Sequence, residues 1–168
     1  MRKSRRFAAA APLALLASVA LAEDQTVTQS FQAKRVQIDA LAGNLKVIVA
    51  RDKPSIDVTL SGSSEMIQKI RLSTSGDAMV MSMDGVEGDW WDDMWDWSSV
   101  SPEDLNVTIT VATGTPVRVD NYIGDADIGD IEAALKMNTS GGQVRAGRVT
   151  DADVSIAGSG DIALGAVS

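Results

Sequence analysis

The fold of this chain is decided by three stretches that share one pattern: GDADIGDI from Gly124, GQVRAGRV from Gly142 and GDIALGAV from Gly160. Each stretch begins 18 residues after the one before it. Superimposing them brings apolar or small side chains into register and places a glycine at the sixth position of each. A fixed period with one apolar row per strand is typical of a chain that winds in stacked coils. The apolar rows are Ala126, Val144 and Ile162; Ile128, Ala146 and Leu164; and Ile131, Val149 and Val167.

This period predicts an all-β fold, a parallel β-solenoid (β-helix-like) with coils of about 18 residues. We expect one such domain over residues 23–168, with its clearest repeats at 124–168. Val144 and Ile162 should then lie in neighbouring tiers of one interior. The second strand of the coil repeats less well, because Val154 falls 18 residues after Lys136 rather than after an apolar residue. The repeat therefore slips there by one residue.

No cap is visible after the last repeat. The end of a solenoid exposes unpaired backbone and core side chains, and it usually carries a cap. The sequence therefore favours either further chain beyond Ser168 or a partner that covers this end.

The first half of the chain is rich in strand patterns, in which apolar and polar residues alternate. We expect residues 23–30 to be a loose polar leader and the ordered structure to begin at Phe31. Residues 64–69 suggest a single helical turn with Ser64 as its N-cap. The alternation at 78–83 places three methionines on one face, which we interpret as a core edge. These methionines are Met79, Met81 and Met83.

Residues 1–22 have the features of a secretory signal peptide. Basic residues stand at positions 2, 3, 5 and 6, an apolar run follows, and Ala20-Leu21-Ala22 provides the small residues of a cleavage site. No residue separates Arg6 from Phe7, which favours the ordinary secretion route over the twin-arginine route. The apolar run is too short for a membrane span, and no later stretch is long and apolar enough for one. The sequence therefore predicts an exported protein of the periplasm or cell surface.

Charge and composition exclude several classes of function. Removing the four basic residues of the signal takes the formal net charge from -8 to -12, which disfavours nucleic acids and anionic membranes as partners. The chain has no cysteine and no histidine. Thiol nucleophiles, imidazole bases and the usual zinc ligand sets are therefore absent. We predict no catalytic residue, no cofactor and no metal site.

Residues 84–104, which we call the Trp–Asp segment, differ from everything around them. The segment holds eight acidic residues, no basic residue and all four tryptophans of the chain. We interpret it as a long loop between two strands. Exposed indoles could stack on sugar rings or enter a protein interface, with aspartates accepting hydroxyl hydrogens or holding calcium. A cap over the N-terminal side of the solenoid and a disordered loop remain alternatives. The candidate binding residues are Trp90, Trp91, Trp95, Trp97, Asp92, Asp93 and Asp96.

Aspartates in the repeats suggest calcium but fit a structural role better. Residues 158–162, GSGDI, look like part of a calcium-binding nonapeptide repeat, yet that motif must recur every nine residues and here the period is 18. We expect Asp161 to accept backbone N–H bonds at a corner turn. Asp125, Asp127 and Asp130 are expected on a solvated face.

The repeats GSGDI and S-G-G-x-V-x-x-G-x-V, behind a signal peptide and a strand-rich first half, resemble a bacterial family. It is the "putative auto-transporter adhesin, head GIN domain" family, with its related adhesin β-solenoid domains. The resemblance implies a parallel β-solenoid and a cell-envelope location. It brings no catalytic residues, and the Trp–Asp segment has no counterpart in the family pattern.

These observations predict an exported, non-enzymatic, adhesin-like protein that binds an envelope protein or glycan through the Trp–Asp segment. One alternative is a structural envelope protein that associates with itself through an uncapped solenoid end. A second alternative is a carbohydrate-active enzyme on a β-helix scaffold, since such scaffolds host paired carboxylates near sugar clefts.

Overall fold

The computed structural model describes residues 24–84 and 104–168. The predicted signal peptide and the interior of the Trp–Asp segment lie outside these residues. The elements in chain order are β1 (Asp24–Phe31), β2 (Arg35–Ala42), β3 (Asn44–Val49), β4 (Ile56–Ser63), α1 (Ser64–Gln68), β5 (Ile70–Ser75), β6 (Ala78–Met83), β7 (Leu105–Val111), β8 (Val117–Ile123), β9 (Ala126–Ile128), β10 (Ala134–Ala146) and β11 (Asp151–Leu164).

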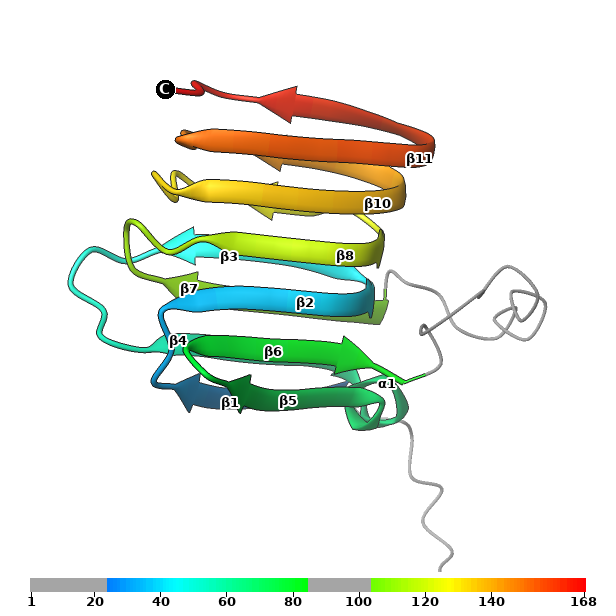
Figure 1. The fold of residues 1–168 in the computed structure, drawn as a ribbon. Helices are drawn as coiled ribbons and strands as arrows, with labels where there is room; N and C mark the ends of the chain where they lie inside the picture. The colour runs from blue at the N-terminus through cyan, green and yellow to red at the C-terminus, as the bar shows by residue number, and fades with distance from the viewer. Residues whose placement is uncertain (1–23, 85–103) are drawn as a thin grey trace, which may run out of the picture.

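The described strands form one sheet of eleven strands, in the order β1-β4-β7-β3-β9-β10-β8-β2-β6-β5, with β11 paired to β10. Strand β10 joins the two halves of this sheet, because its first part pairs with β8 and its last part pairs with β9. The sheet curls around the core into a nearly closed, barrel-like shape. Its two end strands, β1 and β5, lie at the same end of the stack, opposite the C-terminus (Figure 1).

The prediction of a parallel β-solenoid is wrong, because parallel and antiparallel pairs are mixed in this sheet. Strands β1 and β4, β4 and β7, and β5 and β6 run antiparallel. The order of stacking also departs from the order of the chain, since β2 lies between β6 and β8 and β3 lies between β7 and β9. Alternating apolar and polar residues specify which face of a strand is buried, and they leave the direction of the neighbouring strand open.

The 18-residue repeat itself is confirmed as the register between layers. Gln143 pairs with Asp161 and Val144 pairs with Ile162, both in parallel strands. The one-residue slip is confirmed as well, since Val154 pairs with Met137 and the register shifts after Thr139. Like side chains therefore stack above like ones in the last layers, as the pattern predicted.

Glycines allow the layers to approach closely at one corner of the stack. Gly124 and Gly142 have φ values of 134° and 104°, in the left-handed region that favours glycine. A Cβ at Gly142 would overlap the carbonyl oxygen of Gly124, and a Cβ at Gly124 would overlap that of Gly43. The corner therefore requires glycine for space as well as for conformation.

The interior is filled by apolar side chains from both halves of the sheet. The three methionines of β6 are fully buried, which confirms the predicted core edge. The largest buried side chain among the described residues is Tyr122, whose hydroxyl lies 2.7 Å from the carbonyl oxygens of both Gly43 and Asp125 and shares its one donor hydrogen between them. Burial raises the pKa of Tyr122 far above its usual value, so the phenol stays protonated as a donor.

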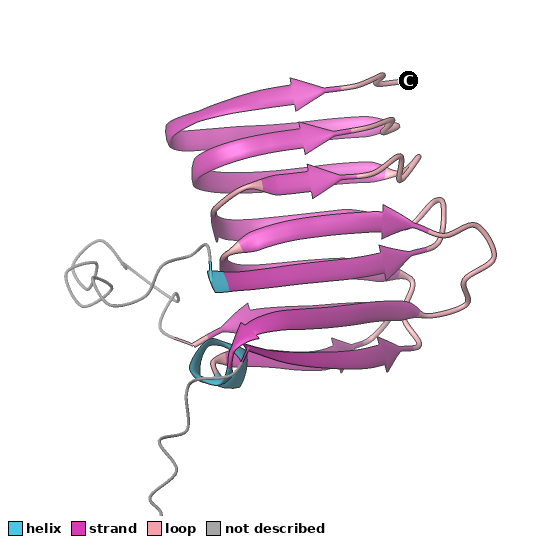
Figure 2. Cartoon of the chain, turned by 180° about the vertical axis from the view of Figure 1, so that it is seen from behind, coloured by secondary structure: helices cyan, strands magenta, loops and turns pink. Residues whose placement is uncertain are grey.

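The sequence-based predictions were wrong for residues that cover the end of the stack near β1 and β5. Residues 24–30 form most of strand β1 rather than a loose leader, and they pair with β4. The N-cap of α1 is Ser63 rather than Ser64, and its hydroxyl accepts a hydrogen bond of 3.4 Å from the Met66 backbone N–H. Met66 is buried beneath this short helix, which lies at the end opposite the C-terminus (Figure 2).

Candidate binding surface

The candidate contact residues of the Trp–Asp segment lie outside the described part of the chain. The structure does describe the residues that flank them. Asp84 follows β6, and its carboxylate accepts hydrogen bonds of 2.6 and 2.7 Å from the Arg71 guanidinium. Asp104 directly precedes β7. The segment thus connects β6 and β7, which lie on opposite halves of the sheet.

A polar hollow of about 290 Å³ opens on the outer face of β7, β3, β9 and β10. It is lined mainly by outward side chains, because residues on each strand alternate between the core and the solvent. We call this group the polar hollow. Its polar lining residues are Asn44, Lys46, Asn106, Thr108, Asp125, Asp127, Gln143 and Arg145.

One row of the hollow is held together by hydrogen bonds between layers. The Asn44 amide donates to the Asn106 side-chain oxygen at 3.2 Å, and the Gln143 backbone N–H donates to the Asp125 carboxylate at 2.9 Å. The Arg145 guanidinium donates to the Gln143 side-chain oxygen at 3.1 Å. These bonds fix the positions of the polar groups along the stack.

A second row offers groups without partners. Lys46 lies opposite Asp127, and Asp127 lies opposite Arg145, in neighbouring parallel strands. Neither the Lys46 ammonium nor the Asp127 carboxylate has an ion pair or side-chain hydrogen bond to a described residue. The hollow therefore presents a free donor and a free acceptor to a polar ligand.

Two of the aspartates that suggested calcium serve instead as links between layers. Asp125 accepts the Gln143 N–H, and Asp130 accepts the Arg148 N–H at 2.8 Å together with its guanidinium at 3.2 Å. These bonds lower the pKa of Asp130 below its usual value. In the described ranges no group of three or more acidic side chains is placed to hold a metal ion.

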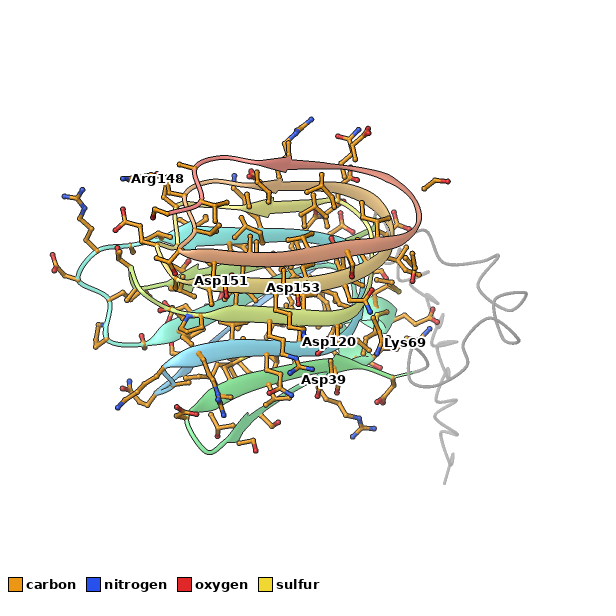
Figure 3. All side chains as sticks on the ribbon, turned by 45° about the horizontal axis from the view of Figure 1, so that its top comes forward. Asp39, Lys69, Asp120, Arg148, Asp151 and Asp153 are labelled. Atoms are coloured by element: carbon orange, nitrogen blue, oxygen red, sulfur yellow. The ribbon has the colours of Figure 1, made fainter. Side chains whose placement is uncertain are left out.

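The outer face of the other half of the sheet carries its own charges, and most of them are paired. Figure 3 shows Asp39, Asp120 and Asp153 on β2, β8 and β11. Asp120 accepts from Arg118 at 2.6 Å, and Asp153 lies 3.3 Å from the Lys136 ammonium. A smaller hollow of about 250 Å³ beside Arg118 and Lys136 is therefore largely neutralised by neighbouring acids.

Comparison with known proteins supports the architecture. No family model and no curated protein matches the chain. A "putative cell adhesion protein" from Clostridium sporogenes aligns with a TM-score of 0.50 and 8% identity, over 84% of this chain and all of that one. Two structures described as "putative adhesin", from Parabacteroides merdae and Parabacteroides distasonis, align with TM-scores of 0.43 and 0.46 and 12% and 10% identity.

The likeness to the Clostridium structure shows a shared fold. The two Parabacteroides alignments cover 83% and 85% of this chain, which spans 56% and 58% of those structures. One structure described as a cell adhesion protein thus shares the fold of this chain, whereas no family model supports the narrower resemblance to the head GIN domain family. Within the described residues, no helix has the length and apolar character that crossing a bilayer requires.

Proposed function

We propose that this chain is an exported, non-enzymatic binding protein of the cell envelope, which holds a glycan or a protein on the outer face of its sheet. The polar hollow forms one part of the contact surface. The Trp–Asp segment forms the other, through Trp90, Trp91, Trp95 and Trp97 and the aspartates among them.

The continuity of the chain from the segment into the hollow carries this proposal. Strand β7 begins directly after the segment, and its second and fourth residues, Asn106 and Thr108, line the hollow. Indoles stack on the faces of sugar rings, while amides and charged groups bind hydroxyls. The free Lys46 and Asp127 supply such groups beside the point where the segment enters the sheet.

The electrostatics of the described acids support binding rather than catalysis. A general acid of a glycosidase needs a raised pKa. The carboxyl groups whose pKa values are shifted here, Asp57, Asp84 and Asp130, are all shifted downward by hydrogen bonds. The buried polar residues of the described part are two threonines, Thr115 and Thr139. Turnover of any sugar in a panel of glycans would restore the carbohydrate-active enzyme as the better description.

The description of the Clostridium structure as a cell adhesion protein agrees with a binding role at a surface. Export follows from the signal peptide that the sequence predicts. N-terminal sequencing of the protein from fractionated bacteria tests it, with an N-terminus at Glu23 in the exported fraction as the expected result. Retention of an intact N-terminus in the cytoplasm would contradict export.

Tryptophan fluorescence tests the ligand and its place together. Titration with a glycan panel should quench or shift the emission of the mature protein, and Trp90→Ala and Trp95→Ala should reduce the affinity for the responding glycan. Lys46→Gln should weaken binding about two- to fivefold, as expected for one polar contact. Lys34→Gln is the matched control, because Lys34 is an exposed lysine away from the hollow. Unchanged emission with every glycan and with a panel of envelope proteins would overturn the proposal.

A further inference from the structure

A row of outward hydrogen-bonding side chains crosses β4, β7, β3, β9 and β10, which lie side by side in the sheet. The layers run nearly level with one another when the molecule is seen from behind (Figure 2). Neighbouring strands lie about 4.8 Å apart, so a row over five strands extends about 19 Å along the stack. We call it the central row. Its members stand directly opposite one another in successive pairs, which are Thr59 with Thr108, Thr108 with Lys46, Lys46 with Asp127, and Asp127 with Arg145.

Most of the central row is open to a ligand. Lys46 and Asp127 are the free donor and acceptor of the polar hollow, and the Thr108 hydroxyl also has no hydrogen bond to a described residue. The Arg145 guanidinium donates through Nη2 to Gln143 and keeps its other N–H groups. Donors and acceptors therefore alternate from layer to layer along the stack.

The two sides of the central row differ in polarity. On one side lie the hydrogen-bonded amides of the polar hollow, such as Asn44 and Asn106. On the other side Ile48, two residues after Lys46 on the same face of β3, is 40% exposed. Gly129, whose N–H donates to the Val47 carbonyl, adds no side chain beside it. The surface thus combines a polar centre with an apolar margin, as sites for sugars do.

We propose that the polar hollow and the central row bind an extended, uncharged β-1,4-linked polysaccharide that lies along the stack, across the strands. This inference rests on the proposed function, because it names the class of ligand for the same site. Successive sugars of such a chain follow one another at close to the spacing of β-strands, so one sugar lies over each strand. Its hydroxyls accept from Lys46 and Arg145 and donate to Asp127, while the C–H face of a ring covers Ile48.

Charge favours an uncharged chain over an acidic one. The charged residues that line the polar hollow balance one another, since they are Lys46, Arg145, Asp125 and Asp127. With the predicted signal removed, the formal net charge of the protein is -8 - 4 = -12, which repels an acidic polymer. The remaining polar lining consists of uncharged amides and a threonine.

The glycosidic linkage decides whether a chain can follow the central row. A β-1,4-linked chain of pyranoses is an extended ribbon, whose hydroxyls recur along a straight line. An α-1,4-linked chain of the same sugar curls into a helix, so only one or two of its sugars reach the row together. A straight row across level strands therefore selects its ligand by shape.

Calorimetric titration of the mature protein tests this inference with a signal that does not depend on its tryptophans. The probes are β-1,4-linked oligomers of glucose and of N-acetylglucosamine, from two to eight sugars long. For at least one of these sugars, affinity should rise about threefold with each added sugar, up to about five sugars, and then level off. The matched controls are α-1,4-linked glucose oligomers, which should bind about tenfold more weakly at equal length.

Two variants place the bound oligomer on the central row. Asp127→Ala should weaken the binding of a six-sugar β-linked oligomer about fivefold, through the lost hydrogen bond to a charged group. Ile48→Ser should weaken it about twofold, through the lost apolar contact. Asp52→Ala is the control and should leave binding unchanged, because Asp52 is an exposed acid in the turn after β3.

The results distinguish a failure of this inference from a failure of the proposed function. Affinity that does not increase beyond two sugars, or equal affinity for α- and β-linked oligomers, would overturn the inference and leave a glycan-binding protein. The absence of binding to every oligomer would overturn the inference too. The fluorescence titrations with other glycans and with envelope proteins would then decide the proposed function.

Discussion

The two ends of the described stack differ in how far their apolar side chains are buried. At one end, β1, β4 and β5 turn antiparallel and α1 covers the interior with Met66. At the other end, β11 repeats the pattern of β10 and leaves Ile162 and Leu164 exposed. At the end where the apolar interior is covered, the stacked repeat is replaced by polar edge strands and a capped helical turn. Repeating the pattern only moves the exposed layer one step further along the stack.

The largest difference in stability between an inner layer and the outermost layer is expected for substitutions at the glycine corner. In Gly142→Ala the new Cβ would overlap the Gly124 carbonyl oxygen at a φ of 104°, and layers on both sides prevent relief. We expect a loss of more than about 4 kcal/mol of stability, or failure to fold. Gly160→Ala meets the Gly142 carbonyl in the same way. It should cost much less, because only the last layer must move.

Urea denaturation followed by circular dichroism measures both variants. Gly76→Ala is the control, since it has a positive φ of 60° in the β5–β6 hairpin but open space around it. It should cost about 1 kcal/mol. Equal losses for Gly142→Ala and Gly160→Ala would show that the last layer is as firmly held as the inner ones.

The second prediction compares the loss of stability when a side chain is shortened at each end of the stack. Met66→Ala removes a buried side chain, only 3% exposed, from beneath α1 and should cost about 3 kcal/mol. Leu164→Ala removes a side chain that is 39% exposed at the free edge and should cost less than about 1 kcal/mol. The free energies of unfolding in urea provide the measurement. A larger loss for Leu164→Ala would mean that the open edge is covered in solution.

The smallest effect is expected in the dependence of stability on pH. Bonds from Lys53 and Ser30 lower the pKa of Asp57 below 3.8, and bonds from Arg148 do so for Asp130. A lowered folded-state pKa gives stability that is present above the usual pKa and is lost as the pH falls through the folded value. Thermal midpoints should therefore decline below about pH 4.

Asp57→Asn and Asp130→Asn should each flatten this decline, measured as thermal midpoints between pH 6 and pH 2. The effect should be larger for Asp57, whose side chain is 24% exposed, than for Asp130 at 51%, because solvent screens exposed pairs. A decline of unchanged steepness in both variants would contradict the assignment of these bonds.

The sequence predicted the last layers better than the first ones, for a physical reason. In the three repeated stretches that begin at Gly124, Gly142 and Gly160, each residue has a counterpart 18 positions away, so the pairing of Val144 with Ile162 could be predicted from the sequence. In the first half, strands such as β4 and β6 alternate equally well, but nothing in their pattern tells whether a neighbour runs parallel. Extending the repeat over the whole chain produced the wrong fold class.

The alternation of apolar and polar residues in the sequence predicts neither strand β1 nor the polar hollow. Strand β1 is exposed on most of its residues, and its Thr26 and Thr28 bond to hydroxyls of β4, so it lacks the apolar alternation of a half-buried strand. The polar hollow gathers residues from β3, β7, β9 and β10. Lys46 and Asp127 are 81 positions apart in the sequence, and only the inserted position of β3 makes them neighbours.

The positions of β2 between β6 and β8 and of β3 between β7 and β9 affect how the chain folds. Strands β2 and β3 are made early, yet every partner they have, β6, β8, β7 and β9, is made later. Arg35 of β2 pairs with Ala78 of β6, 43 residues later, and Leu45 of β3 pairs with Ala126 of β9, 81 residues later. Assembly must therefore wait for distant parts of the chain, and high contact order of this kind slows folding. We therefore expect the sheet to be completed only after β8 and β9 have been synthesised.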